Sequence, residues 1–187
     1  TQIQGRASMG GNLCNASPAA DAVPAMIAAD AVCTIAGPDG RREAKVEEIV
    51  TGPGQTSLAV GEIIVDFFFP ERLPRSGDAY LRFIPRTEMD IAVVGAAVSL
   101  TLDESGVCKA ARVALGAVAA TQVVVEDGAK ALIGSPLDDE AMKKLAAAAS
   151  ACCSPINDKR GTIEYRTKVA GVLARRVWRR RRWLAIA

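Results

Sequence analysis

The apolar segment 91–102 constrains the fold of this chain more than any other part of the sequence. It reads Ile-Ala-Val-Val-Gly-Ala-Ala-Val-Ser-Leu-Thr-Leu, and only two of its twelve residues have polar side chains. A strand this long and apolar cannot be exposed on both faces, so we expect it to be the central strand of a sheet. Segments 79–86 and 107–117 are the flanking strand candidates, and Asp103-Glu104-Ser105-Gly106 is predicted to join the last two strands as a hairpin. A three-stranded antiparallel sheet follows from this pattern.

Three helices are predicted after the strands. The first lies near 122–132 and ends at Gly134, and the second runs from Asp138 to Cys153. Asp-Asp-Glu opens the second helix, where the helix dipole favours acidic side chains. The third is expected from Gly161 to Trp183. Strands followed by a run of helices indicate the α+β class, because an alternating βαβ order is absent.

The first part of the chain is predicted to be a smaller unit with its own elements. Residues 17–30 are expected to form a short helix with Ser17 as N-cap, although Pro24 could start a second short helix after a kink. Segments 31–36 and 41–46 are predicted to pair as a hairpin around Gly37-Pro38-Asp39-Gly40, and 62–69 is predicted to be a strand. The turn formers in 71–78 mark a boundary, which divides the chain into domains 1–74 and 78–187.

Composition excludes several kinds of chemistry. The chain has no His, which removes the usual zinc site, imidazole haem ligation and any Ser-His or Cys-His pair. Its five cysteines lack CxxC spacing, so we expect packing roles, including for the adjacent Cys152-Cys153, in a reducing cytoplasm. No window reaches the roughly 18 apolar residues of a membrane span, and no secretory signal is predicted. Because the sequence starts at Thr1 rather than Met, we expect a fragment, a processed piece or one half of a split gene.

Positive charge is concentrated near the C-terminus. Residues 159–182 contain ten basic residues and one acid, a charge of +9 against −7 for the remainder. Trp178 and Trp183 flank Arg179–Arg182, a pattern that could bind phosphates or an anionic membrane surface. We expect instead a solvated or subunit-facing helix and no nucleic-acid partner, since basic side chains also suit the end of a helix.

A glycine-rich segment near the N-terminus is the one motif that suggests chemistry. Ser8-Met9-Gly10-Gly11-Asn12 precedes a segment that opens a helix. Two glycines let a backbone approach an anionic group, and amides of such a turn can form an anion-binding nest. Asp21 follows and could hold ligand hydroxyls. Taken alone, these residues favour an ordinary tight turn over a ligand site, because the spacing of a dinucleotide or P-loop fingerprint is absent.

Taken together, the motifs resemble the FAD-binding medium subunits of molybdenum hydroxylases, such as aerobic carbon monoxide dehydrogenase and bacterial xanthine dehydrogenase-like enzymes. The resemblance covers nearly the whole chain. It rests on the Ser8–Asn12 segment with 15–21, on 52–56 with 62–64, on 80–86 with 90–92, and on 155–158 with 164–166.

This resemblance implies the second half of a PCMH-type FAD-binding domain followed by a carbon monoxide dehydrogenase flavoprotein C-terminal-like domain. Electrons would reach FAD from 2Fe-2S clusters on a small subunit and leave to NAD, a quinone or oxygen. A large molybdopterin subunit would hold the substrate. The resemblance assigns no catalytic or metal-binding residue to this chain, and it implies these flavin contacts: Ser8, Met9, Gly10, Gly11, Asn12, Asp21, Ile64, Tyr80 and Arg82.

Two of these residues have simpler interpretations. Asp21 could be only an acid at the start of a helix, and Arg82 only a surface charge on an edge strand. Relatives also carry about a hundred further residues at the front, including an earlier Gly-Gly loop that grips the pyrophosphate. We therefore expect about half of an FAD site here and an inactive chain on its own. The alternative function is an assembly or interaction module that binds no flavin.

Overall fold

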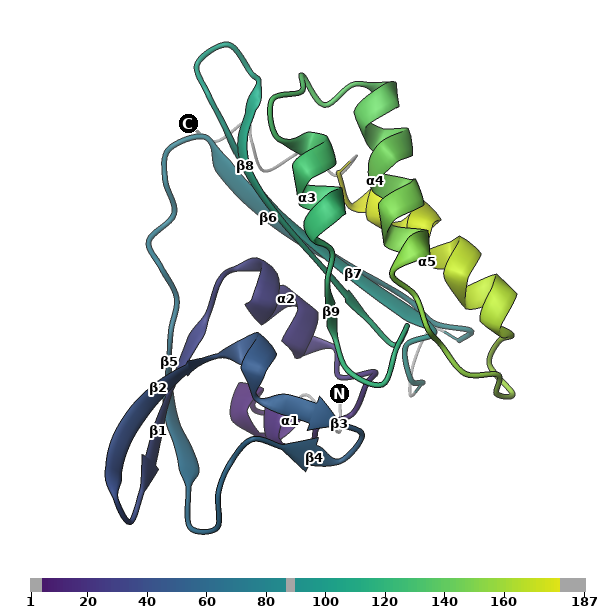
Figure 1. Cartoon of the computed structure of the whole chain (residues 1–187). Helices are drawn as coiled ribbons and strands as arrows, with labels where there is room; N and C mark the ends of the chain where they lie inside the picture. The colour runs from purple at the N-terminus through teal and green to yellow at the C-terminus, as the bar shows by residue number, and fades with distance from the viewer. Residues whose placement is uncertain (1–4, 87–89, 179–187) are drawn as a thin grey trace.

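The computed structural model describes residues 5–86 and 90–178, in two halves joined by an irregular segment at 69–75 (Figure 1). The predicted Arg-rich end, Arg179–Arg182 with Trp183, lies outside the described residues. The first half contains α1 (Met9–Cys14), α2 (Ala22–Ala28), β1 (Val32–Gly37), β2 (Gly40–Lys45), the 3-10 turn η1 (Val46–Glu48), β3 (Val50–Gly52), β4 (Gln55–Thr56) and β5 (Ile63–Phe68). The second half contains β6 (Ser76–Phe83), β7 (Val94–Leu102), β8 (Cys108–Gly116), β9 (Val123–Val124), α3 (Glu126–Leu132), α4 (Asp139–Ala151) and α5 (Ile163–Trp178).

The second half is an antiparallel sheet in the order β6-β7-β8-β9, with three helices on one face (Figure 1). β7 pairs with β6 on one side and β8 on the other, so the prediction of a central strand is confirmed. Its alternate residues from Val94 to Leu100 face the helices and share a core with Leu115, Leu132 and Leu145. The α+β class predicted from the element order is therefore confirmed.

A short fourth strand replaces the start of the first predicted helix. Val123 and Val124 pair with Leu115 and Ala114 as β9, and α3 begins only at Glu126. Consecutive β-branched residues favour an extended backbone, whereas the Glu126-Asp127 pair suits the first turn of a helix. The sheet therefore has one short strand more than predicted. The prediction also left Ser76–Asp78 in the boundary segment, but these residues already belong to β6.

The opposite face of the sheet carries small side chains and receives α2. Gly95, Ala97, Ala114 and Gly116 lie on this face, and Ala114 belongs to the core of the first half. A methyl group at Gly116 would lie 2.8 Å from Pro24, so the absence of a side chain lets α2 approach the sheet. Figure 1 shows α2 on this side and α3, α4 and α5 on the other. The sheet thus sits between two layers of helices.

The predicted helix at 17–30 is wrong in its first part. Ser17 accepts a bond from the Ala19 amide at 3.3 Å without capping a helix, and the chain becomes helical again only at Ala22. Pro24 is the third residue of α2, where a missing N–H costs no intrahelical bond. The alternative of a second short helix starting at Pro24 is closer to the structure, although the helix begins at Ala22 and no earlier helix or kink precedes it within residues 15–21. The helix α1 at Met9–Cys14 was not predicted from the sequence.

The predicted hairpin is confirmed as β1 and β2, and β5 completes a sheet in the order β2-β1-β5. Arg42 on β2 reaches past β1 to Glu62, with its Nε and Nη2 atoms 2.7 and 2.8 Å from the two carboxylate oxygens. The Ala59 amide donates to the same carboxylate at 2.7 Å. The bond from Arg42 is the main reason that the pKa of Glu62 falls from its ordinary 4.5 to about 2, and the Ala59 amide adds to the shift.

No helix among the described residues is long and apolar enough to cross a bilayer. The division into domains 1–74 and 78–187 stays a prediction. Contacts of α2 with β7 and β8 cross that boundary.

The lowered pKa of Glu62 predicts a pH-dependent contribution to stability. Because the folded state binds this proton less tightly than the unfolded state, the contribution is present above about pH 4.5 and is lost as the pH falls toward 2. We expect Glu62→Gln to lower the free energy of unfolding at neutral pH, with a difference from the native chain that shrinks across this window. Urea unfolding at several pH values measures it. Glu104→Gln is the control, because Glu104 is exposed and makes no hydrogen bond among the described residues. A difference independent of pH would contradict the prediction.

Candidate functional site

The glycine-rich segment forms the first turn of α1 rather than the open turn predicted from its composition. Ser8 is the N-cap, and its Oγ accepts a hydrogen bond from the Gly11 amide at 3.0 Å. Neither Gly10 nor Gly11 has a positive φ, so the backbone conformation itself does not require glycine at these two positions. The amides of Met9 and Gly10 have no hydrogen-bond partner among the described residues. These two N–H groups remain available to a ligand.

Asn12 connects α1 to the start of α2. Its Oδ1 atom accepts a hydrogen bond from the Ala22 amide at 2.9 Å, which satisfies a donor at the N-terminus of α2. Asp21 holds the N-cap position of α2 but makes no capping bond with its side chain. Because Asn12 serves one of these amides, the Asp21 carboxylate is directed elsewhere. The interpretation of Asp21 as only a helix-entry acid therefore does not describe its contacts.

The Asp21 carboxylate bonds to two predicted site residues on β6. Tyr80 donates its hydroxyl hydrogen to Oδ1 at 2.9 Å, and Arg82 donates to Oδ2. Burial is the main cause that raises the pKa of Tyr80 above its ordinary value, and the charge of Asp21 adds to it. The phenol therefore remains a hydrogen-bond donor at neutral pH. Gly95 on β7 makes room for the Tyr80 ring, since a methyl group there would lie 2.8 Å from the hydroxyl oxygen.

Arg82 lies on an edge strand, as its simpler interpretation supposed, but its charge is paired. Its side chain is 36% exposed and that of Asp21 is 40% exposed, so both remain within reach of solvent or a ligand. The structure thus brings together the Ser8–Asn12 segment, Asp21, Tyr80 and Arg82, which are far apart in the sequence. We call this group the α2 junction.

Ile64 is the remaining predicted contact and lies on β5. It is half-buried against the core of the first half and pairs with Ile35. Its strand runs beside α1, because the Phe67 ring lies 3.8 Å from the position that a methyl group at Gly10 would occupy. Ile64 therefore belongs to an element that flanks the junction.

Sequence reasoning missed a second contact at the other end of α2. Arg112 on β8 donates from Nε to the Ile27 carbonyl at 2.6 Å and from Nη2 to the Glu47 carboxylate. Arg112 also lies 3.6 Å from Asp30. The available signal was that Arg112 is one of two charged residues in the mostly apolar segment 107–117 and alternates with Ala110, Ala114 and Gly116 on one face. Arg112 fixes the C-terminal end of α2 on the sheet.

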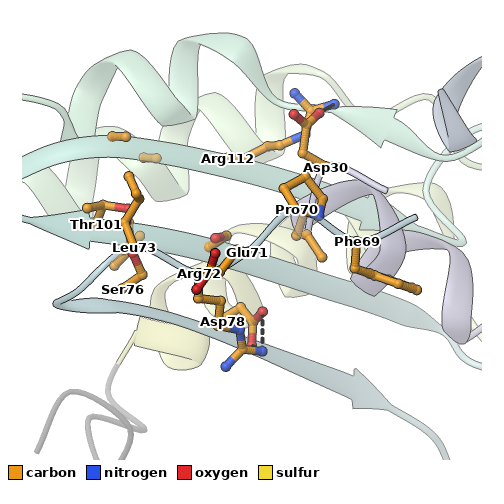
Figure 2. A pocket seen from close by; sticks show the side chains of 16 residues that line it. Asp30, Phe69, Pro70, Glu71, Arg72, Leu73, Ser76, Asp78, Thr101 and Arg112 are labelled. Carbon is orange, nitrogen blue, oxygen red and sulfur yellow. Dashed lines mark hydrogen bonds and ion pairs between the residues drawn. The ribbon is translucent and has the colours of Figure 1, made fainter. Parts of the chain in front are cut away.

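A cavity of about 480 Å³ lies beside this second contact and away from the predicted residues (Figure 2). The segment 69–73 crosses over it, the end of α2 forms one wall, and β6, β7 and β8 form the floor. Two of its charged lining groups pair with each other, since Arg72 bonds both oxygens of Asp78 at 2.7 Å. None of the nine predicted flavin contacts lines this cavity. The α2 junction is therefore separate from this cavity.

Within the described residues, no three His, Cys, Asp or Glu side chains lie close enough together to hold a metal ion. All five cysteines are free thiols.

Comparison with known proteins gives two family matches. Residues 1–72 match the FAD binding domain in molybdopterin dehydrogenase, and residues 79–181 match the CO dehydrogenase flavoprotein C-terminal domain. The chain is 35% identical over 175 residues to the carbon monoxide dehydrogenase medium chain of Afipia carboxidovorans. It is 29% identical over 178 residues to the xanthine dehydrogenase FAD-binding subunit of Escherichia coli O157:H7. Both alignments cover 94% of this chain, which spans about 60% of the length of these relatives.

Solved structures agree with the sequence matches. Carbon monoxide dehydrogenase from Oligotropha carboxidovorans superposes with a TM-score of 0.92 at 34% identity, over all of this chain and 64% of that chain. Quinoline 2-oxidoreductase from Pseudomonas putida 86 superposes with a TM-score of 0.86 at 27% identity, over 96% of this chain and 62% of that chain.

The hydrogen bond from Tyr80 to Asp21 should stabilise the contact between the two halves. We expect Tyr80→Phe to lower the free energy of unfolding by about 1 kcal/mol, because a half-buried carboxylate loses one donor while Arg82 remains. Chemical denaturation measures the change. Tyr165→Phe is the matched control, since Tyr165 is 43% exposed and its hydroxyl has no hydrogen-bond partner among the described residues. Equal losses in the two variants would show that the bond contributes nothing.

Proposed function

The chain belongs to the family of FAD-binding medium subunits of carbon monoxide dehydrogenase- and xanthine dehydrogenase-like molybdenum hydroxylases, and we propose that it carries part of the FAD site in such an enzyme. Its partners would be a large molybdopterin subunit and a small subunit with 2Fe-2S clusters. In this role it helps to pass electrons from the clusters through FAD to an external acceptor. The family matches at both halves of the chain are the observation that carries the proposal.

The described residues fit an FAD molecule at the α2 junction. The amides of Met9 and Gly10 have no hydrogen-bond partner in the part of the chain that the structure describes, and Gly11 is exposed. Such backbone can lie close to a phosphate-bearing chain. Next to it, Asp21 and Arg82 offer one acceptor and one cationic donor on partly exposed side chains. This donor set matches a ligand that carries both phosphates and hydroxyl groups.

FAD supplies the electron-transfer chemistry when it is bound, and the protein's share is orientation and electrostatic tuning. We infer that Ser8, Met9, Gly10 and Gly11 hold the phosphate-bearing chain. Asn12 fixes α1 against α2, so that the position of these amides relative to the Asp21 carboxylate stays constant. Tyr80 is then a positioning residue that orients the Asp21 carboxylate rather than a direct ring neighbour.

Arg82 and Ile64 complete the proposed site. Arg82 places a positive charge beside Asp21 at the edge of the sheet, in reach of the flavin ring system. Ile64 contributes an apolar contact from β5. Because the chain spans about 60% of its relatives, the rest of the site would come from the part that it does not match.

A module that binds no flavin is the second candidate function. The paired state of the Asp21 carboxylate favours it, because Tyr80 and Arg82 already satisfy this group without a ligand. In that case the junction would serve only to join the two halves of the chain.

Reconstitution separates the two functions and tests the site. The chain is co-expressed with the unmatched portion of a relative's medium chain, and the purified complex is examined for bound flavin and thermal unfolding. We expect a yellow complex, with flavin affinity reduced roughly tenfold in Gly11→Ala, since about 1.4 kcal/mol corresponds to a factor of ten. The added methyl group would cover the exposed turn and crowd Ser8 Oγ at 3.0 Å. The fold should be nearly unchanged, because alanine is a better helix former than glycine.

A colourless native complex would favour the module. Unchanged flavin affinity in Gly11→Ala would remove Gly11 from the site. Loss of both fold and flavin would show that Gly11 is only structural.

A further inference from the structure

Two adjacent thiols lie at the C-terminal end of α4, on the far side of the sheet from the α2 junction. Cys152 is the C-cap of the helix, and Cys153 follows it. Both Sγ atoms donate to the same acceptor, the carbonyl oxygen of Ala149, at 3.3 and 3.0 Å. Both residues are half-buried against the helix-facing core. The two sulfur atoms therefore converge on one point near the surface.

The backbone around these thiols is held in place. The amide of Cys152 bonds to Ala148 O at 3.2 Å, and that of Cys153 bonds to Ser150 O at 3.3 Å. The next amide, of Ser154, bonds to Val118 O at 2.8 Å in the loop after β8. The convergence of the sulfur atoms is thus part of a hydrogen-bonded helix end.

This pair is poorly suited to forming a disulfide with itself. Consecutive Cα atoms across a trans peptide are about 3.8 Å apart, and all described peptide bonds are trans. Relaxed disulfides join Cα atoms about 4.4–6.8 Å apart. The pair therefore remains a dithiol under conditions that oxidise better-spaced cysteines.

Metal ions with three or four ligands do not fit either. No third His, Cys, Asp or Glu accompanies the pair among the described residues, so a tetrahedral zinc site cannot be completed there. Two close sulfur atoms also cannot lie on opposite sides of a linear two-coordinate ion. What fits is a centre that bonds to two neighbouring sulfur atoms on the same side and brings its own third substituent.

We propose that Cys152 and Cys153 form a binding site for monosubstituted trivalent arsenicals, compounds of the form R–As=O. Arsenic forms one bond to each sulfur and keeps its bond to carbon, which gives a pyramidal three-coordinate centre. The two thiols give up their protons, the As–O bonds break, and the oxygen leaves as one water molecule. Arsenic stays trivalent, and no oxidant or reductant is needed.

The interaction between the two thiols favours formation of the first arsenic–sulfur bond. The interaction of each thiol with the other is the main cause that lowers the pKa of Cys152 and raises the pKa of Cys153. Thiolate is the nucleophilic form of cysteine, so Cys152 is the expected first attacker and Cys153 closes the ring.

Phenylarsine oxide titration of the full native chain tests the site. We expect one adduct by native mass spectrometry, stable to an excess of the monothiol 2-mercaptoethanol and removed by the dithiol 2,3-dimercaptopropanol. Cys152→Ser and Cys153→Ser should each lose the monothiol-stable adduct, because one sulfur cannot chelate. Cys14→Ser is the matched control and should retain it, since Cys14 is exposed but lies in α1.

Two results would overturn the proposal. One is a monothiol-stable adduct that persists in either single variant at position 152 or 153. The other is an adduct on the unsubstituted chain that forms only after unfolding in urea, which would show that the thiols serve solely to cap α4. This second comparison holds even if a variant fails to fold.

Discussion

The close packing of α2 on the small-residue face of the sheet determines the geometry of the rest of the molecule. Gly95, Ala97, Ala114 and Gly116 leave a shallow surface, and Pro24 occupies the space that a side chain at Gly116 would need. Polar contacts then fix both ends of the helix. Asp21 bonds Tyr80 and Arg82 at its start, and Arg112 bonds the Ile27 carbonyl near its end. The contacts of Asp21, Tyr80 and Arg82 with one another all depend on the position of α2 against the sheet.

The same packing explains why Asp21 is available for a functional role. The side chain of an acid at an N-cap position usually accepts a hydrogen bond from an amide in the first turn of its own helix. Here the Asn12 side chain accepts from the first-turn amide of Ala22 instead. Asp21 can therefore reach across to β6. Two side chains from the first half and two from the sheet meet at one surface, although Asn12 and Arg82 are seventy residues apart. The bound position of FAD in our proposal follows from this meeting point.

The sheet could be predicted from the sequence because its signals are local. The apolar run 91–102, the hairpin turn at Gly37–Gly40 and the β-branched strands all carry their own period and turn chemistry, and the structure has each of them. The short helices were harder to predict from the sequence. α1 has only six residues, two of them glycines, so its helicity depends on the Ser8 cap and on packing rather than on propensity. Residues 17–21 contain helix formers but lie outside any helix, which also shows that propensity alone does not decide where a short helix forms.

The candidate flavin contacts came only from the resemblance and remain a prediction, and the contacts that these residues make with one another could not be predicted from the sequence. Nothing local in the sequence says that Tyr80 donates to Asp21, because that bond depends on the register of β6 beside Gly95. The contacts of Arg112 could not be predicted from the local sequence either. Its charge in a mostly apolar strand was visible in the sequence, but its partners on α2 and η1 are set by tertiary packing. Polar pairs between residues far apart in the sequence can be identified only when the tertiary structure is known.

The most direct measurement of the central claim is amide hydrogen exchange at α1 in the reconstituted complex with and without FAD. The free amides of Met9 and Gly10 have no acceptor among the described residues, so they should exchange quickly without flavin. If they bond the flavin's phosphate-bearing chain, FAD should slow their exchange while amides of α4 stay unchanged. Flavin binding with no protection at Met9 and Gly10 would contradict this account.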